Sequence, residues 1–136
     1  MFIAVLATDN PEKVQNWYMK NFGIQKREVS KTNISVLDRS FGFQMGTGQY
    51  GLTVIPLNGQ SLIEVDEYPK IAKKRNYQEG LLPQGNALMS IFIDSINSLI
   101  PMSISEPVMI NFPPYNGAKS ITVKGAAGEL IEFIER

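Results

Sequence analysis

The sequence predicts an α+β domain in which the order β-α-β-β-β occurs twice. Two short strands carry the clearest sign of this repeat, because Leu62-Ile63-Glu64-Val65 and Leu130-Ile131-Glu132-Phe133 both place one carboxylate between apolar neighbours. Side chains alternate between the two faces of a strand, so each glutamate shares a face with the leucine two residues before it. A repeated strand with a carboxylate on a defined face indicates a duplicated module. Duplicated modules often build one cavity between two similar halves.

The first half is predicted to begin with a buried strand from Phe2 to Ala7, followed by a helix. Asp9 and Asn10 supply N-cap side chains, Pro11 suits the first helical position, and Gly23 is a natural C-terminal stop. The apolar and aromatic residues of this segment follow at helical spacing: Val14, Trp17, Tyr18 and Phe22. Such a stripe is typical of a helix packed on a core, and Trp17 is also a candidate for lining a ligand site.

The pattern after Gly23 changes to strands. We expect a strand from Gln25 to Ser30, which Ile34 to Leu37 either continues or follows as the start of a hairpin. Residues 38–49 are rich in glycine and are predicted to form a loop or an irregular strand. The strongest short turn signal, Asn58-Gly59, joins the next two predicted strands into a hairpin, Tyr50 to Leu57 and Ser61 to Asp66.

The second half repeats this order with a shorter helix. A polar connector at about residues 69–86 precedes it, and Asp94 is expected to cap a short helix that Pro101 ends. Its predicted strands are Leu88 to Ile93, Val108 to Phe112, Ala118 to Lys124 and Glu129 to Glu135. We therefore expect one domain over residues 1–136, with module one at about 1–68 and module two at about 87–136.

The composition excludes several classes of function. The chain has 13 basic and 13 acidic side chains, and this balance predicts no nucleic-acid or anionic-membrane partner. The absence of cysteine excludes disulfides, zinc-thiolate sites and cysteine nucleophiles, and the absence of histidine removes the commonest general base and transition-metal ligand. No apolar run approaches the roughly 20 residues of a membrane span, so a cytoplasmic location is expected.

One glycine-rich motif resembles a dinucleotide-binding fingerprint. Gly46-Thr47-Gly48-Gln49-Tyr50-Gly51 matches G-x-G-x-x-G, and Asp66 lies at about the expected distance beyond it. That fingerprint must open a helix, whose N-terminus receives the pyrophosphate. Here the glycines lead instead into the β-rich run from Leu52 to Ile55. The sequence therefore predicts a loop and no nucleotide site.

Glu64 and Glu132 are the candidate catalytic residues. A strand commonly carries an outward glutamate for solubility, but the recurrence of both residues at matching places in two similar halves favours a role in function. Two inward carboxylates could bind a divalent metal, accept hydrogen bonds from a ligand, or act as acid and base. Buried carboxylates would also require partners.

Several of these motifs resemble the vicinal oxygen chelate superfamily, which includes glyoxalase I, bleomycin-resistance proteins, extradiol dioxygenases and methylmalonyl-CoA epimerase. The run Asn10-Pro11-Glu12-Lys13, followed by Trp17-Tyr18 and Phe22-Gly23, resembles its first helix. The paired strand ends of that superfamily are similar to two segments of this chain, Gly51 to Val65 and Gly128 to Phe133. The resemblance implies the glyoxalase/bleomycin-resistance fold, with two βαβββ modules forming a curled mixed sheet around a cup-shaped cavity. It also implies a homodimer.

The resemblance further implies a metal site in which Glu64 and Glu132 match the two carboxylate ligands. The matching first-strand positions fall at or near Ile3 and Leu88, and neither side chain can bind a metal. Two carboxylates alone could hold Mg²⁺ or Mn²⁺ with several waters, but they make a poor Fe²⁺ or Ni²⁺ site. We therefore expect no metal cofactor, with Glu64 and Glu132 as the ligands of Mg²⁺ or Mn²⁺ if one is used.

Two hypotheses of function follow. The first is metal-independent binding of a small, partly aromatic or apolar molecule in the cup, as in resistance or sequestration. Its candidate ligand-binding aromatics are Trp17, Phe41, Phe43, Tyr50 and Tyr115. The alternative is a lyase, isomerase or epimerase in which Glu64 or Glu132 removes a proton beside a carbonyl, with or without Mg²⁺ or Mn²⁺.

Overall fold

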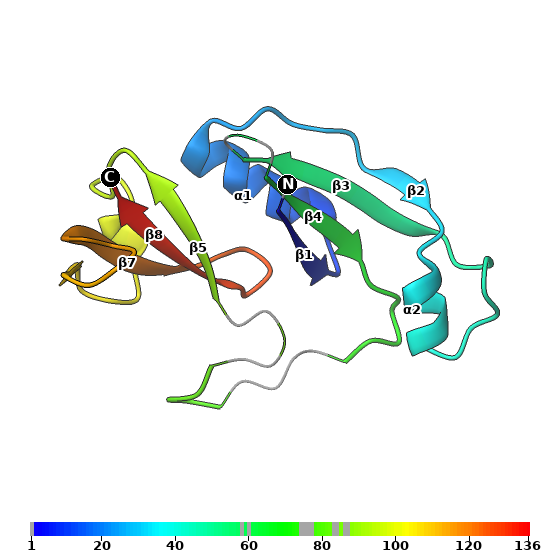
Figure 1. Cartoon of the computed structure of the whole chain (residues 1–136). Helices are drawn as coiled ribbons and strands as arrows, with labels where there is room; N and C mark the ends of the chain where they lie inside the picture. The colour runs from blue at the N-terminus through cyan, green and yellow to red at the C-terminus, as the bar shows by residue number, and fades with distance from the viewer. Residues whose placement is uncertain (1, 58, 60, 74–77, 83–84, 86–87) are drawn as a thin grey trace. The chain divides into compact units, whose positions relative to one another are not determined.

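The computed structural model describes residues 2–57, 59, 61–73, 78–82, 85 and 88–136. The chain divides into two compact units, Met1–Lys74 and Arg75–Arg136. Each unit contains one four-stranded mixed sheet (Figure 1). The predicted α+β class and the repeated module are therefore confirmed, as two separate four-stranded sheets.

Unit 1 holds sheet A, in which the strands lie in the order β1-β4-β3-β2. Strands β1 and β4 are parallel, and the other two pairs are antiparallel. The elements of the unit are β1 (Ile3–Thr8), α1 (Pro11–Phe22), β2 (Ser30–Thr32), α2 (Ser35–Ser40), β3 (Tyr50–Pro56) and β4 (Leu62–Glu67). The predicted turn at Asn58-Gly59 lies between β3 and β4, and Asn58 falls outside the described residues.

Helix α1 forms as its capping residues predict. The Asn10 side chain accepts a hydrogen bond from the Lys13 backbone N–H (2.9 Å), and Gly23 ends the helix in the left-handed conformation (φ 64°). The helix lies against β3 and β4. Its buried side chains include Val14 and Tyr18, and they cover the face of sheet A that carries Ile55, Ile63 and Val65, all of which are buried.

Two predictions for the segment before β3 are wrong. A strand was expected from Gln25 to Ser30, but the observed strand β2 begins only at Ser30. Residues 25–28 are polar and exposed, so they have no apolar face to pack on the core. Ile34 to Leu37 does not continue a strand, because helix α2 begins at Ser35. This helical turn places Asp38 where the surrounding loop can donate hydrogen bonds to its carboxylate, as described below.

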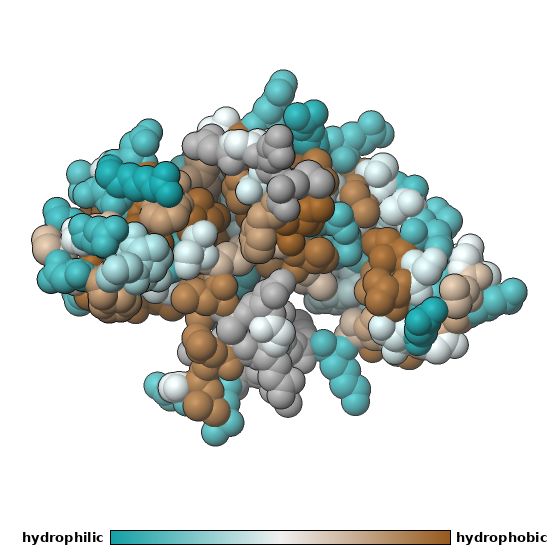
Figure 2. All heavy atoms as spheres, viewed as in Figure 1, coloured by the Kyte–Doolittle hydropathy of each residue, from teal (hydrophilic) through white to brown (hydrophobic). Residues whose placement is uncertain are grey.

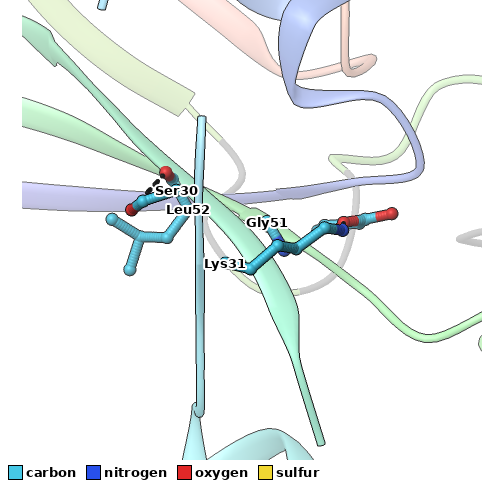
Figure 3. A network of polar contacts seen from close by, with 5 residues as sticks. Ser30, Lys31, Gly51 and Leu52 are labelled. Carbon is cyan, nitrogen blue, oxygen red and sulfur yellow. Dashed lines mark hydrogen bonds and ion pairs between the residues drawn. The ribbon is translucent and has the colours of Figure 1, made fainter. Parts of the chain in front are cut away.

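The short edge strand β2 pairs with β3 in sheet A, and side chains add to this pairing (Figure 3). The Ser30 hydroxyl donates to the Leu52 carbonyl (3.4 Å), and Lys31 forms an ion pair with Glu67 of β4. The same Glu67 carboxylate also accepts a hydrogen bond from the backbone N–H of Gly51 in β3 (2.9 Å). A Cβ at Gly51 would lie 2.7 Å from that carboxylate, so a larger residue here would displace the Glu67 side chain.

Unit 2 holds sheet B, which has the same topology in the order β5-β8-β7-β6. Its elements are β5 (Leu88–Ile93), the 3₁₀ turn η1 (Ile100–Met102), β6 (Val108–Ile110), β7 (Ala118–Lys124) and β8 (Leu130–Glu135). One face of this sheet forms a core from Ile121, Val123, Ile131 and Phe133, each at most 1% exposed. The predicted strands β5, β7 and β8 are confirmed, and β6 ends two residues earlier than expected.

The helix expected between Asp94 and Pro101 is replaced by turns and by η1. The segment is only a few residues long and contains Ser95 and Asn97, which favour turns; the Ser95 hydroxyl accepts a hydrogen bond from the Asn97 N–H (3.3 Å). Its apolar residues still reach the core, because Ile96 and Leu99 are 1% and 2% exposed.

No helix in the described ranges is long and apolar enough to cross a membrane.

Candidate functional site

The two predicted glutamates lie on the faces of the sheets opposite to the buried cores. On sheet A, Glu64 shares its face with Leu62 and Asp66. The register places Val5 of β1 and Val54 of β3 beside Glu64. Ile3 and Val5 are 43% and 44% exposed. Figure 2 shows hydrophobic and hydrophilic residues side by side on the visible face of the molecule. Glu64 is therefore a half-buried carboxylate in largely apolar surroundings.

Asp66 is the more deeply buried carboxylate on this face. Its side chain is 6% exposed, and its Oδ1 atom has no hydrogen-bond partner in the described part of the chain. Its neighbours across the sheet are Ala7 and Leu52. Burial, followed by the negative charge of Glu64, raises the pKa of Asp66 to about 6. The sequence places Asp66 on the same face as Glu64, but it does not reveal this burial.

On sheet B, Glu132 is held by three hydroxyl groups. Ser90 and Tyr115 donate hydrogen bonds to its Oε2 atom (2.6 and 3.3 Å), and Ser120 donates to its Oε1 atom (3.0 Å). The charge of Glu132, followed by burial, raises the pKa of Tyr115. Glu132 is thus a fixed hydrogen-bond acceptor.

The strand register explains why these groups meet. Ser90 lies opposite Glu132 in the parallel pair β5–β8, and Ser120 of β7 lies opposite Ile134, the next residue of β8 on the same face. Sequence reasoning missed both serines. Alternation along the strands Leu88 to Ile93 and Ala118 to Lys124, combined with pairing to β8, is the signal that could have identified them.

Tyr115 also borders an open hollow at one end of sheet B. The hollow has a volume of about 420 Å³, and it is lined by Tyr115, Phe92, Lys119, Glu135 and Arg136 together with residues 114 and 116–118. The Arg136 guanidinium lies over the Phe92 ring, 3.7 Å from its centroid. Phe92 and Ser90 share a face of β5, and Tyr115 both lines the hollow and donates to Glu132.

The predicted aromatic residues lie in different places. Tyr115 contacts Glu132, whereas Trp17 lies on α1, which covers the face of sheet A opposite to Glu64. The Phe41 and Phe43 rings stack on each other after α2, with their centroids 6.4 Å apart. Tyr50 is 5% exposed, and its hydroxyl donates to Asp38. The structure therefore brings Tyr115 together with a predicted glutamate.

The glycine-rich motif surrounds the buried carboxylate of Asp38. This carboxylate accepts hydrogen bonds from the Tyr50 hydroxyl (2.6 Å), the Asn33 amide (2.7 Å) and the Gly46 backbone N–H (2.8 Å). The bonds from Tyr50 and Asn33 hold the pKa of Asp38 below its usual range, and the bond to Asp38 raises the pKa of Tyr50 to about 12. The motif runs into strand β3, as expected, and its first two glycines, Gly46 and Gly48, donate to Asp38.

The residues present do not fit the transition-metal site that the resemblance implies. The described residues contain no cluster of three or more potential His, Cys, Asp or Glu ligands. The residue opposite Glu64 is Val5. The residue opposite Glu132 is Ser90, whose hydroxyl donates a hydrogen bond to the carboxylate. Ile3 and Leu88, the expected first-strand positions, lie opposite Leu62 and Leu130. This set of side chains lacks the nitrogen and sulfur ligands that Fe²⁺, Ni²⁺ and Zn²⁺ sites use.

Comparisons with known proteins agree with this architecture. No family model matches the chain, and no curated protein matches it in sequence. A glyoxalase family protein from Bacillus cereus aligns over 99% of this chain and 92% of its own, with a TM-score of 0.70 and 15% identity. A glyoxylase/bleomycin resistance protein/dioxygenase domain from Frankia aligns over 99% and 95%, with a TM-score of 0.60 and 12% identity.

Glyoxalase I from Zea mays is similar to the whole of this chain, with a TM-score of 0.62 and 15% identity. The alignment covers 44% of the maize chain, so the present chain spans less than half of that enzyme. Together these likenesses confirm the expected glyoxalase-like fold.

Proposed function

We propose that this chain, which has the fold of the vicinal oxygen chelate superfamily, binds a small, partly apolar molecule without a metal. The observation that carries the proposal is the carboxylate of Glu132, fixed by three hydroxyl groups on the open face of sheet B. Leu88 and Phe92 lie on the same side of β5 as Ser90 and are 42% and 38% exposed. They supply apolar contact area beside a polar group of fixed orientation, which is the usual composition of a small-molecule site.

The hydrogen bonds of Glu132 define the chemistry of the expected ligand. A carboxylate offers about four acceptor positions, and the three hydroxyl groups use three of them, two on Oε2 and one on Oε1. The free position on Oε1 can accept one hydrogen bond from a bound molecule. We therefore expect a ligand with an apolar or aromatic body and a hydroxyl or N–H donor.

The proposal is tested by titrating ¹⁵N-labelled protein with 2-phenylethanol and with its methyl ether, which has no donor. We expect 2-phenylethanol to shift the amide signals of β5 and β8, and the ether to bind more weakly. Glu132→Gln should weaken 2-phenylethanol binding by about tenfold, because it removes one charged acceptor. Ser90→Ala, which frees the carboxylate to rotate, should weaken it less. Glu64→Gln is the matched control on sheet A and should leave it unchanged.

Two results would overturn the proposal. One is the absence of any shift in β5 and β8 at millimolar concentrations of both compounds. The other is equal affinity of the wild type and the Glu132→Gln variant, with circular dichroism showing both to be folded. In that case Glu132 would serve only to hold the strands of sheet B together.

A further inference from the structure

The open face of sheet A carries two carboxylates that the proposed function does not use. Glu64 and Asp66 are two residues apart on β4 and therefore point to the same side. Asp66 is 94% buried, and its Oδ1 atom has no hydrogen-bond partner within the described ranges. The nearest positions across the sheet are Ala7 and Leu52, which carry no charge.

An ionised carboxylate in this position is unfavourable without a partner. Burial removes its hydration, and Glu64 adds repulsion, and together these two effects raise the pKa of Asp66 to about 6. At pH 7 the group is still about nine-tenths ionised. Glu67, the next residue, points to the other face, where it pairs with Lys31. A cation beside Asp66 would offset the charge of its carboxylate and would also interact with Glu64.

We propose that Glu64 and Asp66 bind the ammonium group of a small molecule with an apolar body. Each N–H of an ammonium group can donate to a carboxylate, so one group can contact the carboxylates of Asp66 and Glu64 together. The apolar body would lie on Val5, Val54 and Leu62, which surround Glu64 on this face and are half-buried or exposed. This proposal uses different residues from the Glu132 site, and the two can fail separately.

The surroundings favour an organic cation over a metal ion. Ca²⁺ takes six to eight oxygen ligands, and Mg²⁺ requires an octahedral set with several ordered waters. The described residues offer no third acidic ligand here, and the positions beside Glu64 are the valines Val5 and Val54. Apolar side chains cannot hold the waters that a divalent ion would retain, whereas they contact an alkyl or aromatic body favourably.

The test compares 2-phenylethylamine with 2-phenylethanol, which has the same body and no charge. Both are titrated into ¹⁵N-labelled full-length protein at pH 7.5, with Mg²⁺ and Ca²⁺ as separate titrants. We expect the amine to shift the amides around Val5, Val54 and Glu64, and to bind there at least tenfold more tightly than the alcohol. Its affinity should fall as the pH is lowered through about 6, because protonation removes the charge of Asp66.

Substitutions separate this site from the one on sheet B. Asp66→Asn keeps the size of the side chain and should weaken amine binding on sheet A about tenfold or more, and Glu64→Gln should weaken it less. Glu132→Gln is the control and should leave it unchanged. Equal binding of amine and alcohol on sheet A would overturn the proposal, as would unaltered binding by both sheet A variants. Tighter binding of Mg²⁺ or Ca²⁺ at these same amides would also overturn it.

Discussion

Sheets A and B have the same topology and closely matching strand sequences, yet their open faces differ in chemistry. In both sheets the central glutamate follows a buried isoleucine, Ile63 or Ile131, and in both it faces away from the core. Glu132 accepts hydrogen bonds from three hydroxyl groups, whereas Glu64 lies between two valines. The difference arises on the neighbouring strands and not on the strand that carries the glutamate.

The strand register shows at which positions the residues around the two glutamates differ. Val5 in sheet A corresponds to Ser90 in sheet B, because each lies opposite the glutamate on the first strand of its module. Val54 likewise corresponds to Thr122. Two residues beyond the glutamate, sheet A has Asp66 where sheet B has Ile134. A few differences on one face therefore change its chemistry, while the buried core beneath stays apolar in both modules.

The largest effect should come from the shared core, and it tests whether the two halves are equivalent there. Ile63 and Ile131 are fully buried at matching positions, so replacing either with alanine should lower the free energy of unfolding by about 2–5 kcal/mol. Urea denaturation measures this loss, and hydrogen exchange should show reduced protection mainly in the sheet that carries the substitution. A loss below about 1 kcal/mol at one position would show that the two cores are not matched.

The next effect concerns the carboxylate that is present in sheet A and absent from sheet B. The pKa of Asp66 is raised in the folded state, so its ionisation opposes folding, and stability should fall as the pH rises from about 4 through about 6. After allowance for solvent screening, the fall should be about 1–2 kcal/mol. Asp66→Asn should remove it in urea titrations at several pH values. Exposed Asp94→Asn is the control, and an unchanged pH dependence in Asp66→Asn would contradict the prediction.

The smallest effect comes from exchanging the residues beside the two glutamates. Ser90→Val removes one hydroxyl donor from Glu132 and should cost about 1 kcal/mol in the free energy of unfolding. Val5→Ser in the half-exposed surroundings of Glu64 should change it by less than about 0.5 kcal/mol. Chemical denaturation compares the two variants directly. Equal losses would mean that the hydroxyl groups around Glu132 are not what distinguishes the two faces.

Local sequence signals predicted those parts of the fold that local interactions determine. Asn10, Pro11 and Gly23 cap helix α1 from within the same segment, and apolar alternation located β4 and β8. Helix α2 was missed, and the contacts of its residue Asp38 include one with Tyr50, 12 residues away. No pattern within residues 34–40 contains that information.

The candidate site was predicted in part. Glu64, Glu132 and Tyr115 were proposed from the sequence, and the structure brings Tyr115 into contact with Glu132. Ser90 was missed because a polar residue within a strand is typical of a solvent-facing position, and its contact with Glu132 spans 42 residues. The burial of Asp66 could not be predicted, since it depends on how the strands and connections pack around the end of β4.

The glycine-rich segment that contains Gly46 and Gly48 is bound to a carboxylate from the same chain. In a phosphate-binding loop, backbone amides are left free for an incoming phosphate group. Here the Gly46 amide already donates to the carboxylate of Asp38, and Gly48 contributes a second backbone hydrogen bond to it. The backbone amides of this segment therefore already bind the Asp38 side chain of the same polypeptide. This internal anion fixes the loop before β3 and uses the Gly46 amide that an incoming phosphate group would need.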